Sequence, residues 1–199
     1  MNLTAILSGA FAIAALAQQS PTVKSEPFNL IVLSSNPVYN GTYLNGLRAG
    51  PYISKMGFSN TTYKNKPYYL NTTKGSENSG HLCSAYTGIA PSNNLTIPLN
   101  FWLDNSLSTN LASSWMSATG KTTDGVGFDE QGLMGLRIGG HDDTKMPDAK
   151  QVVGGPKVLY RWVACKEFGP YGGVVDTLMW VVGGEPQNPT CYDVSLKRV

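Results

Sequence analysis

A chain of 199 residues with 41% hydrophobic side chains can bury one sizeable core, which excludes an intrinsically disordered protein. The formal net charge is only +2 and no segment concentrates lysine and arginine, so we expect neither nucleic acid nor an anionic membrane as a partner. Charged residues make up 14%, well below the usual value of about 25%, so uncharged polar residues must supply the surface.

The first seventeen residues, MNLTAILSGAFAIAALA, are small and apolar and end in the tripeptide Ala15-Leu16-Ala17. Such a segment followed by polar residues is typical of a secretory signal peptide, and it is too short to span a bilayer. We therefore expect residues 1–17 to be removed. Residues 18–199 then form a single secreted domain that works outside the cell or in the cell wall, with no membrane attachment.

Four Asn-x-Thr sequons support an extracellular compartment, with Asn40, Asn60, Asn71 and Asn94 as predicted glycosylation sites. All four lie in the first half of the chain, so we expect this half to supply the looped outer surface. The second half either forms core strands, which we favour, or presents a binding face.

Three cysteines in an oxidising compartment imply one disulfide and one remaining thiol. Cys165 and Cys191 lie at the edges of predicted strands in the second half, and we pair them. In the chain-entropy model, closing this loop stabilises the fold by about 3–4 kcal/mol. Cys83 is then either free and buried or bonded to another molecule.

In the first half of the chain, the first expected strand covers residues 28–33, an apolar run bounded by turn residues. Residues 42–100 are a mosaic of short aromatic and threonine-rich runs, so short strands and long loops are expected there. The next stretch is ambiguous. A strand fits 101–103, while the spacing of apolar residues from Leu107 to Met116 predicts a short helix.

Strand signals are clearest in the second half. Two short strands are predicted on either side of a turn at 130–132. Two longer strands, 158–165 and 174–182, are joined as a hairpin by the Gly-Pro-Tyr-Gly-Gly connection at 169–173. A last strand alternates over 192–197. These elements predict an all-β fold, a single antiparallel β-sandwich or irregular β-barrel with long loops and at most one or two short helices.

Three stretches of the chain carry a family resemblance: PFNLIVLSSN (27–36), YRWVAC (160–165) and TLMWVVGGEPQNPTCYDVSLKR (177–198). They resemble a family of small secreted proteins of filamentous fungi that is defined by a domain of unknown function. The resemblance implies a secreted, fungal, disulfide-tied protein and supplies no activity. Members often carry a further cysteine pair after the first strand, but residues 44–58 contain no cysteine.

Nucleophilic and metal chemistry have few candidate residues. His81 and Cys83 are two positions apart, but a strand places them side by side without a third group to orient the base. The triplet His141-Asp142-Asp143 could contribute metal ligands, yet a solvated turn explains it better. We therefore assign no catalytic, metal or cofactor-binding residue.

A hydrolase that acts on glycosides needs two acids facing one cleft. The candidate acids are Asp104, Asp129, Glu130, Asp176 and Glu185. Asp176 lies within an apolar strand and is the best candidate for a perturbed carboxylate, although we favour a structural role in which it is hydrogen-bonded.

Aromatic side chains are abundant, and exposed ones can stack on sugars or anchor protein partners. We expect Trp162 and Trp180, which oppose each other in the predicted hairpin, to pack the core. Six tyrosines lie among the sequons and are the better candidates for surface contacts: Tyr39, Tyr43, Tyr52, Tyr63, Tyr68 and Tyr69.

The sequence thus favours a non-enzymatic secreted fungal protein that is wall-associated, glycan-contacting or effector-like, with cell-wall polysaccharide or an extracellular protein as its partner and no cofactor. One alternative is a carbohydrate-active hydrolase that uses an acid pair. The other is a secreted protein-interaction module.

Overall fold

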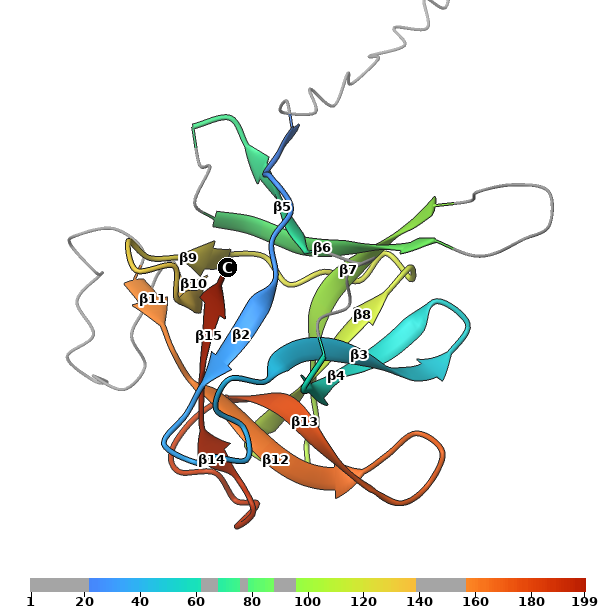
Figure 1. Cartoon of the computed structure of the whole chain (residues 1–199), viewed down its shortest axis with the longest axis vertical. Coiled ribbons are helices and arrows are strands. Elements are labelled where there is room, and N and C mark those ends of the chain that lie inside the picture. The colour runs from blue at the N-terminus through green and yellow to red at the C-terminus, as the bar shows by residue number, and fades with distance from the viewer. Residues whose placement is uncertain (1–21, 62–67, 76–78, 88–95, 139–156) are drawn as a thin grey trace, which may run out of the picture.

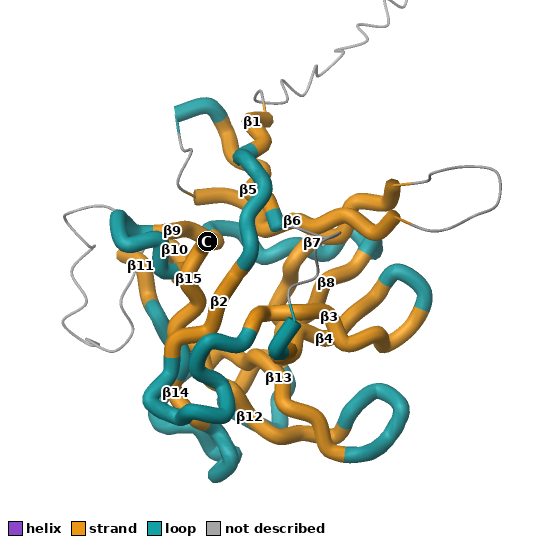
Figure 2. The backbone as a smooth tube through the Cα atoms, in the orientation of Figure 1, coloured by secondary structure: helices purple, strands orange, loops and turns teal. Residues whose placement is uncertain are grey.

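The computed structural model describes residues 22–61, 68–75, 79–87, 96–138 and 157–199, and these residues form strands joined by loops, with no helix among them (Figure 1, Figure 2). The strands are β1 (Thr22–Lys24), β2 (Leu30–Leu33), β3 (Tyr43–Gly50), β4 (Ile53–Ser59), β5 (Tyr69–Thr73), β6 (Ser79–Thr87), β7 (Thr96–Asn105), β8 (Leu111–Ser117), β9 (Val126–Phe128), β10 (Met134–Ile138), β11 (Lys157–Leu159), β12 (Trp162–Phe168), β13 (Val174–Val181), β14 (Tyr192–Asp193) and β15 (Ser195–Arg198). The predicted all-β class is confirmed.

All strand pairs belong to one curled antiparallel sheet that forms a half-barrel. The order along the sheet is β11-β10-β9-β6-β7-β8-β13-β4-β3-β2-β15, with β5 and β1 beside β6, and with β12 and β14 beside β13. The sheet curls so far that its ends meet, because Leu133 and Lys197 form an antiparallel bridge between the β9–β10 turn and β15. The curl encloses the main hydrophobic core.

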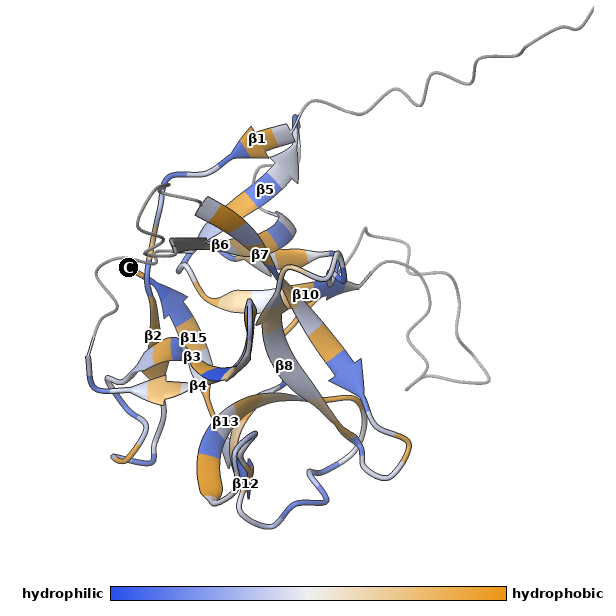
Figure 3. Ribbon diagram, turned by 90° about the vertical axis from the view of Figure 1, so that its right-hand side faces the viewer, coloured by the Kyte–Doolittle hydropathy of each residue, from blue (hydrophilic) through white to orange (hydrophobic). Residues whose placement is uncertain are grey.

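Strands β12 and β13 are buried on both faces. Leu178 and Trp180 belong to the main core, whereas Met179 and Val181 belong to a second, smaller cluster on the opposite face, because successive side chains of a strand point to opposite sides. The loop after β13 covers this second cluster: the Asn110 side chain donates hydrogen bonds to the carbonyl oxygens of Gly183 and Glu185. Hydrophobic and hydrophilic residues alternate along β13 in Figure 3.

The predicted helix between Leu107 and Met116 is wrong, because this stretch forms a turn and strand β8. Strand β8 pairs with β7 in a hairpin in which Phe101 lies opposite Met116 and Trp102 opposite Trp115. Leu107, which would start the apolar face of a helix, is fully exposed in the turn. Pairing with β7, β13 and β4 supplies hydrogen bonds along most of β8, so tertiary context overrides the helical spacing.

Other strand predictions hold with corrections. The hairpin on either side of residues 169–173 and the strand pair around 130–132 are confirmed. The predicted strand 158–165 is broken at Tyr160 and Arg161, because Lys157–Leu159 pairs with β10 and the chain then crosses to pair with β13. The expected mosaic at 42–100 contains strands as long as β6 and β7, and β1 precedes the expected first strand.

Candidate ligand-binding cavity

A cavity of about 390 Å³ lies between the β3–β4 hairpin and strands β6, β7 and β8. It continues the main core, since Met56, Leu99 and Met116 belong to both. The lining residues are Asn45, Gly46, Arg48, Gly50, Pro51, Tyr52, Ile53, Ser54, Met56, Tyr68, Ser84, Leu99 and Met116. Its volume is within the roughly 300–1,000 Å³ typical of small-molecule sites.

Side chains along the β3–β4 hairpin point alternately to the core and away from it, and the residues on the core-facing side explain why the core ends in a cavity. On the core-facing side, the first cross-strand pair is Leu44 with Phe58, and the last is Arg48 with Ser54. Between them Gly46 lies opposite Met56, and a Cβ atom on this glycine would lie 2.9 Å from the Cβ of Ser54. A larger residue than glycine has no room beside Ser54 here, so apolar side chains give way to glycine and polar residues toward the hairpin end, where the cavity begins.

Several polar groups that line the cavity lack a partner within the described residues. The guanidinium of Arg48 and the hydroxyls of Ser54 and Ser84 make no hydrogen bond or ion pair there, although Ser84 is buried. By contrast, the Tyr68 hydroxyl donates to the Leu44 carbonyl oxygen at 2.9 Å. Arg48 is exposed and Ser54 is half-buried, so these groups can bind water in the free protein and remain available to a polar ligand.

The rim of the cavity is a tight turn with an unusual backbone. Strand β3 ends at Gly50 and β4 begins at Ile53, so the turn consists of Pro51 and Tyr52 alone. Tyr52 has a φ of +56°, as at the third position of a type II turn, where glycine is usual. Its carbonyl oxygen accepts a hydrogen bond from the Ala118 amide at 3.1 Å. The turn therefore holds an aromatic side chain, 44% exposed, at the cavity entrance.

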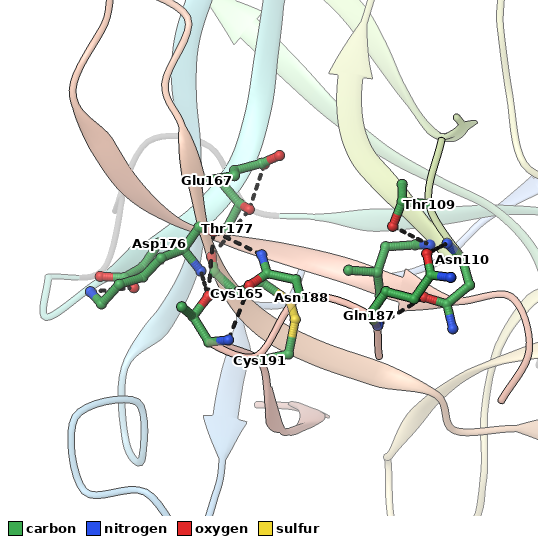
Figure 4. The surroundings of a disulfide bond; sticks show 12 residues. Thr109, Asn110, Cys165, Glu167, Asp176, Thr177, Gln187, Asn188 and Cys191 are labelled. Carbon is green, nitrogen blue, oxygen red and sulfur yellow. Dashed lines mark hydrogen bonds and ion pairs between the residues drawn. A yellow bond between two sulfur atoms is a disulfide. The ribbon is translucent and has the colours of Figure 1, made fainter. Parts of the chain in front are cut away.

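The structure contains the predicted disulfide between Cys165 on β12 and Cys191, just before β14 (Figure 4). Near it, the Lys55 ammonium lies 2.6 Å from the Glu167 carboxylate, which also accepts a hydrogen bond from the Thr177 hydroxyl. The polar side chains here thus partner one another, unlike those of the cavity.

Cys83 is free, as one of the two predicted outcomes, and lies buried on β6. Burial raises the pKa of its thiol to about 11, although the Asn71 backbone and side chain and the charge of Lys24 lower it in part. His81 does not act on it, because the imidazole Nε2 lies 2.6 Å from the Asp124 carboxylate. The thiol stays protonated at neutral pH and is no nucleophile.

The acids considered from the sequence lie in different structural settings. Asp176 accepts hydrogen bonds from the Tyr39 hydroxyl at 2.8 Å and the Lys166 ammonium at 3.0 Å, which matches the structural role favoured for it. Burial raises the pKa of Tyr39, and the hydrogen bond to Asp176 raises it further. Glu167, on the neighbouring strand, faces the opposite side of the hairpin (Figure 4).

Among the acids considered from the sequence, Asp129 and Glu130 both line one hollow near β9 and β10, and Glu185 lines another together with Asp193. Burial raises the pKa of Asp129, but hydrogen bonds from the Leu133 amide, the Tyr160 hydroxyl and the Gln131 and Gly132 amides together lower it below its usual value. A general acid needs a raised pKa, so Asp129 suits the organisation of the turn better than proton donation.

Only some of the tyrosines that were predicted to lie at the surface are exposed. Tyr39, Tyr68 and Tyr69 are buried, because their rings pack into or against the core, whereas Tyr52 is exposed. Trp162 and Trp180 pack the core edge-to-face with ring centroids 4.7 Å apart, as predicted.

The glycosylation sites remain predictions. Asn40 and Asn60 are exposed. Asn71 is half-buried on β5, and its Nδ2 atom, which would carry the sugar, donates to the Cys83 sulfur at 3.5 Å.

Several predicted features fall outside the described residues. They are the signal peptide 1–17, Tyr63, Asn94 and the triplet at 141–143. Within the described part of the chain, no cluster of His, Cys, Asp and Glu could hold a metal ion, and no helix is long and apolar enough to cross a membrane.

Comparison with known proteins gives one match. A family model described as a domain of unknown function, DUF7907, matches residues 25–199. No curated protein and no solved structure matches the chain. The match covers strands β2 to β15, so the cavity and the disulfide lie within one family domain, whereas β1 precedes the matched residues.

Proposed function

Because this chain belongs to the DUF7907 family, whose function is unknown, we propose its function from its geometry. The protein is an extracellular, non-enzymatic protein of a fungal cell surface or the surrounding medium, and it binds a carbohydrate of the cell wall in the cavity beside β3 and β4. The observation that carries this proposal is the set of unpartnered polar groups, from Arg48, Ser54 and Ser84, that line one cavity.

The cavity has the chemistry that saccharide binding requires. Sugar rings present hydroxyl groups at their edges and C–H groups on their faces, so they bind where hydrogen-bonding side chains lie near an aromatic ring. Ser54 and Ser84 offer hydroxyls to the cavity, whereas the Asn45 side chain lies on the other face of the hairpin and donates to the Thr61 carbonyl oxygen. Tyr52 supplies the ring at the entrance.

The settings of the candidate reactive groups favour binding over catalysis. Both oxygens of Asp129 accept hydrogen bonds that order a turn, and Asp176 holds Tyr39 and Lys166 in place. The Cys83 thiol is protonated at neutral pH. None of these three residues lines the cavity.

Two features support an extracellular location. Residues 1–17 have the composition of a signal peptide. The Cys165–Cys191 disulfide is of the kind that persists in oxidising compartments.

The test uses the full-length gene expressed in a secretory host, with the released protein incubated with insoluble chitin and β-glucan and with soluble oligosaccharides. Ser54→Trp places a large ring into the cavity mouth, and we expect it to abolish binding. The matched control, Ser106→Trp, makes the same change in the exposed β7–β8 turn and should bind like the wild type.

Thermal unfolding verifies that both variants fold. If folded Ser54→Trp binds as the wild type does, the cavity is not the site. If the wild type binds none of these saccharides or their acidic counterparts, the protein is not a carbohydrate binder.

A protein-interaction role is the second candidate, favoured by the tip of the β12–β13 hairpin. Phe168, Tyr171 and Val174 are 84%, 74% and 64% exposed, and Phe168 lies opposite Val174. Exposed apolar clusters of this kind mark protein-binding surfaces. A Phe168→Ser, Tyr171→Ser variant should lose an extracellular protein partner captured by the wild type and keep saccharide binding. Retention of that partner would exclude the tip as its site.

A further inference from the structure

We propose that the saccharide bound in the cavity is acidic, and that Arg48 recognises its carboxylate, as in a uronic acid residue. This inference rests on the proposed carbohydrate-binding function and specifies its ligand class. It follows from the charges around the cavity, the free state of the Arg48 guanidinium and the neutral character of the other polar groups.

The charge of the cavity lining is unbalanced. Of the thirteen lining residues, Arg48 carries a positive charge, and none is an aspartate or glutamate. Arg48 is exposed at the edge of the cavity, where water screens its charge in part, but no carboxylate of the lining competes with a bound anion for it. The lining thus favours a ligand with one negative charge over a neutral one.

Arg48 also differs from the other cations of the neighbouring strands. On β4, Lys55 points to the other face of the sheet and pairs with Glu167 at 2.6 Å. On β12, Lys166 pairs with Asp176 at 3.0 Å. Within the described residues, Arg48 has no such partner, although it lies beside Ser54 in the register of the hairpin. Its partner is therefore to be sought in a ligand.

The shape of the guanidinium favours a carboxylate. Its parallel N–H groups match the two oxygens of a carboxylate in a bidentate arrangement, which a lysine cannot reproduce. A single cation also matches a single carboxylate, whereas a phosphate carries up to two charges. The remaining hydroxyls, from Ser54 and Ser84, are neutral and suit the hydroxyls of the same sugar ring.

The experiment titrates the secreted full-length product with an oligoglucuronide and with the neutral gluco-oligosaccharide of the same length, using calorimetry. Arg48→Gln should weaken oligoglucuronide binding by about ten- to hundred-fold, the usual effect of losing a charge-assisted bidentate contact. Its affinity for the neutral ligand should fall less, by up to about fivefold, because a sugar hydroxyl loses only a weaker hydrogen bond to the side chain at this position. Arg48→Lys should fall between Arg48→Gln and the wild type.

Lys157→Gln is the matched control, because it removes the same charge from an exposed position on β11, outside the cavity. It should leave both affinities unchanged. Competition by acetate and by sulfate separates a carboxylate site from a general anion site, and acetate should compete better.

Three results would overturn the inference: equal wild-type affinity for the two oligosaccharides, tight oligoglucuronide binding by Arg48→Gln, or stronger competition by sulfate. If the acidic-ligand inference fails but Ser54→Trp still abolishes binding of the neutral ligand, the cavity is still a carbohydrate site and the proposed function stands. If no saccharide binds the wild type, both fail together.

Discussion

Hairpins β3–β4 and β12–β13 share the tripeptide Gly-Pro-Tyr in their turns, at residues 50–52 and 169–171. The backbone conformations of the two turns nevertheless differ. In the first, two residues connect the strands and Tyr52 takes the positive φ of +56°. In the second, the connection has five residues, and Gly172 and Gly173 take positive φ values instead. Loop length therefore decides which residue adopts the left-handed conformation, and in β3–β4 it places a tyrosine there.

The two hairpins also differ in how their polar side chains are partnered. Around β12 and β13, Lys166 pairs with Asp176, and Glu167 binds both Lys55 and Thr177. On the core-facing side of β3, Arg48 has no partner among the described residues. Lys55 itself belongs to β4, so the face of the β3–β4 hairpin toward β12 and β13 is ion-paired, and we infer that its cavity face keeps groups available for the proposed ligand. Four predictions test this comparison.

The largest effect should come from the disulfide that anchors β12. The double variant Cys165→Ser, Cys191→Ser releases a loop with a sequence separation of 26 residues and should lower the free energy of unfolding by about 3–4 kcal/mol. Urea unfolding measures it, and reduced wild type serves as the control. A loss in the free energy of unfolding below about 1 kcal/mol would contradict a stabilising role for the Cys165–Cys191 disulfide.

Glu167→Gln should have the next largest effect. It leaves the Lys55 ammonium, whose side chain is only 10% exposed, without its carboxylate. We expect a loss of about 2 kcal/mol in the free energy of unfolding, below the roughly 3–5 typical of fully buried pairs, because both side chains keep some contact with water. Glu130→Gln, at an exposed turn, is the control and should change little. Equal effects of the two variants would show that the Lys55–Glu167 ion pair contributes nothing to the free energy of unfolding.

The shared tripeptide allows the same substitution in both turns. Tyr171→Gly should destabilise the protein by about 0.5–1 kcal/mol, since glycine increases the entropy of the unfolded chain. At Tyr52 this loss is offset by relief of the left-handed backbone, worth about 1–2 kcal/mol. Tyr52→Gly should therefore be the more stable variant by about 1 kcal/mol in thermal unfolding. The reverse order would argue against strain at the cavity rim.

The smallest effects should come from two exposed cations, one in each hairpin. Lys166→Gln removes an ion pair with Asp176 and should cost about 0.2–1 kcal/mol in the free energy of unfolding. Arg48→Gln should leave the stability unchanged within about 0.2 kcal/mol, because it breaks no ion pair among the described residues. A larger loss for Arg48→Gln would assign Arg48 a structural role in place of ligand recognition.

Much of the fold could be predicted from local sequence patterns. The errors share one cause, which is packing against strands that are distant in sequence. The β12–β13 hairpin and the Cys165–Cys191 pair follow from alternation, turn residues and spacing. The helix between Leu107 and Met116 was wrong because a strand buried partly on both faces does not alternate cleanly and mimics helical spacing. Burial of Tyr39, Tyr68 and Tyr69 likewise depends on neighbours distant in sequence.

The sequence by itself determined the class of the protein: an all-β chain with one disulfide and the composition of a secreted domain. Only the tertiary structure decided where a ligand fits, because the cavity is made by residues from β3, β4, β6, β7 and β8 that meet through long-range strand pairing. The sequence contains one sign of the cavity: the small residue Gly46 and the charged residue Arg48 stand at positions of β3 where a core-facing strand would carry apolar residues. Which polar groups stay without partners depends on what packs against each face of the sheet, and local sequence does not encode that.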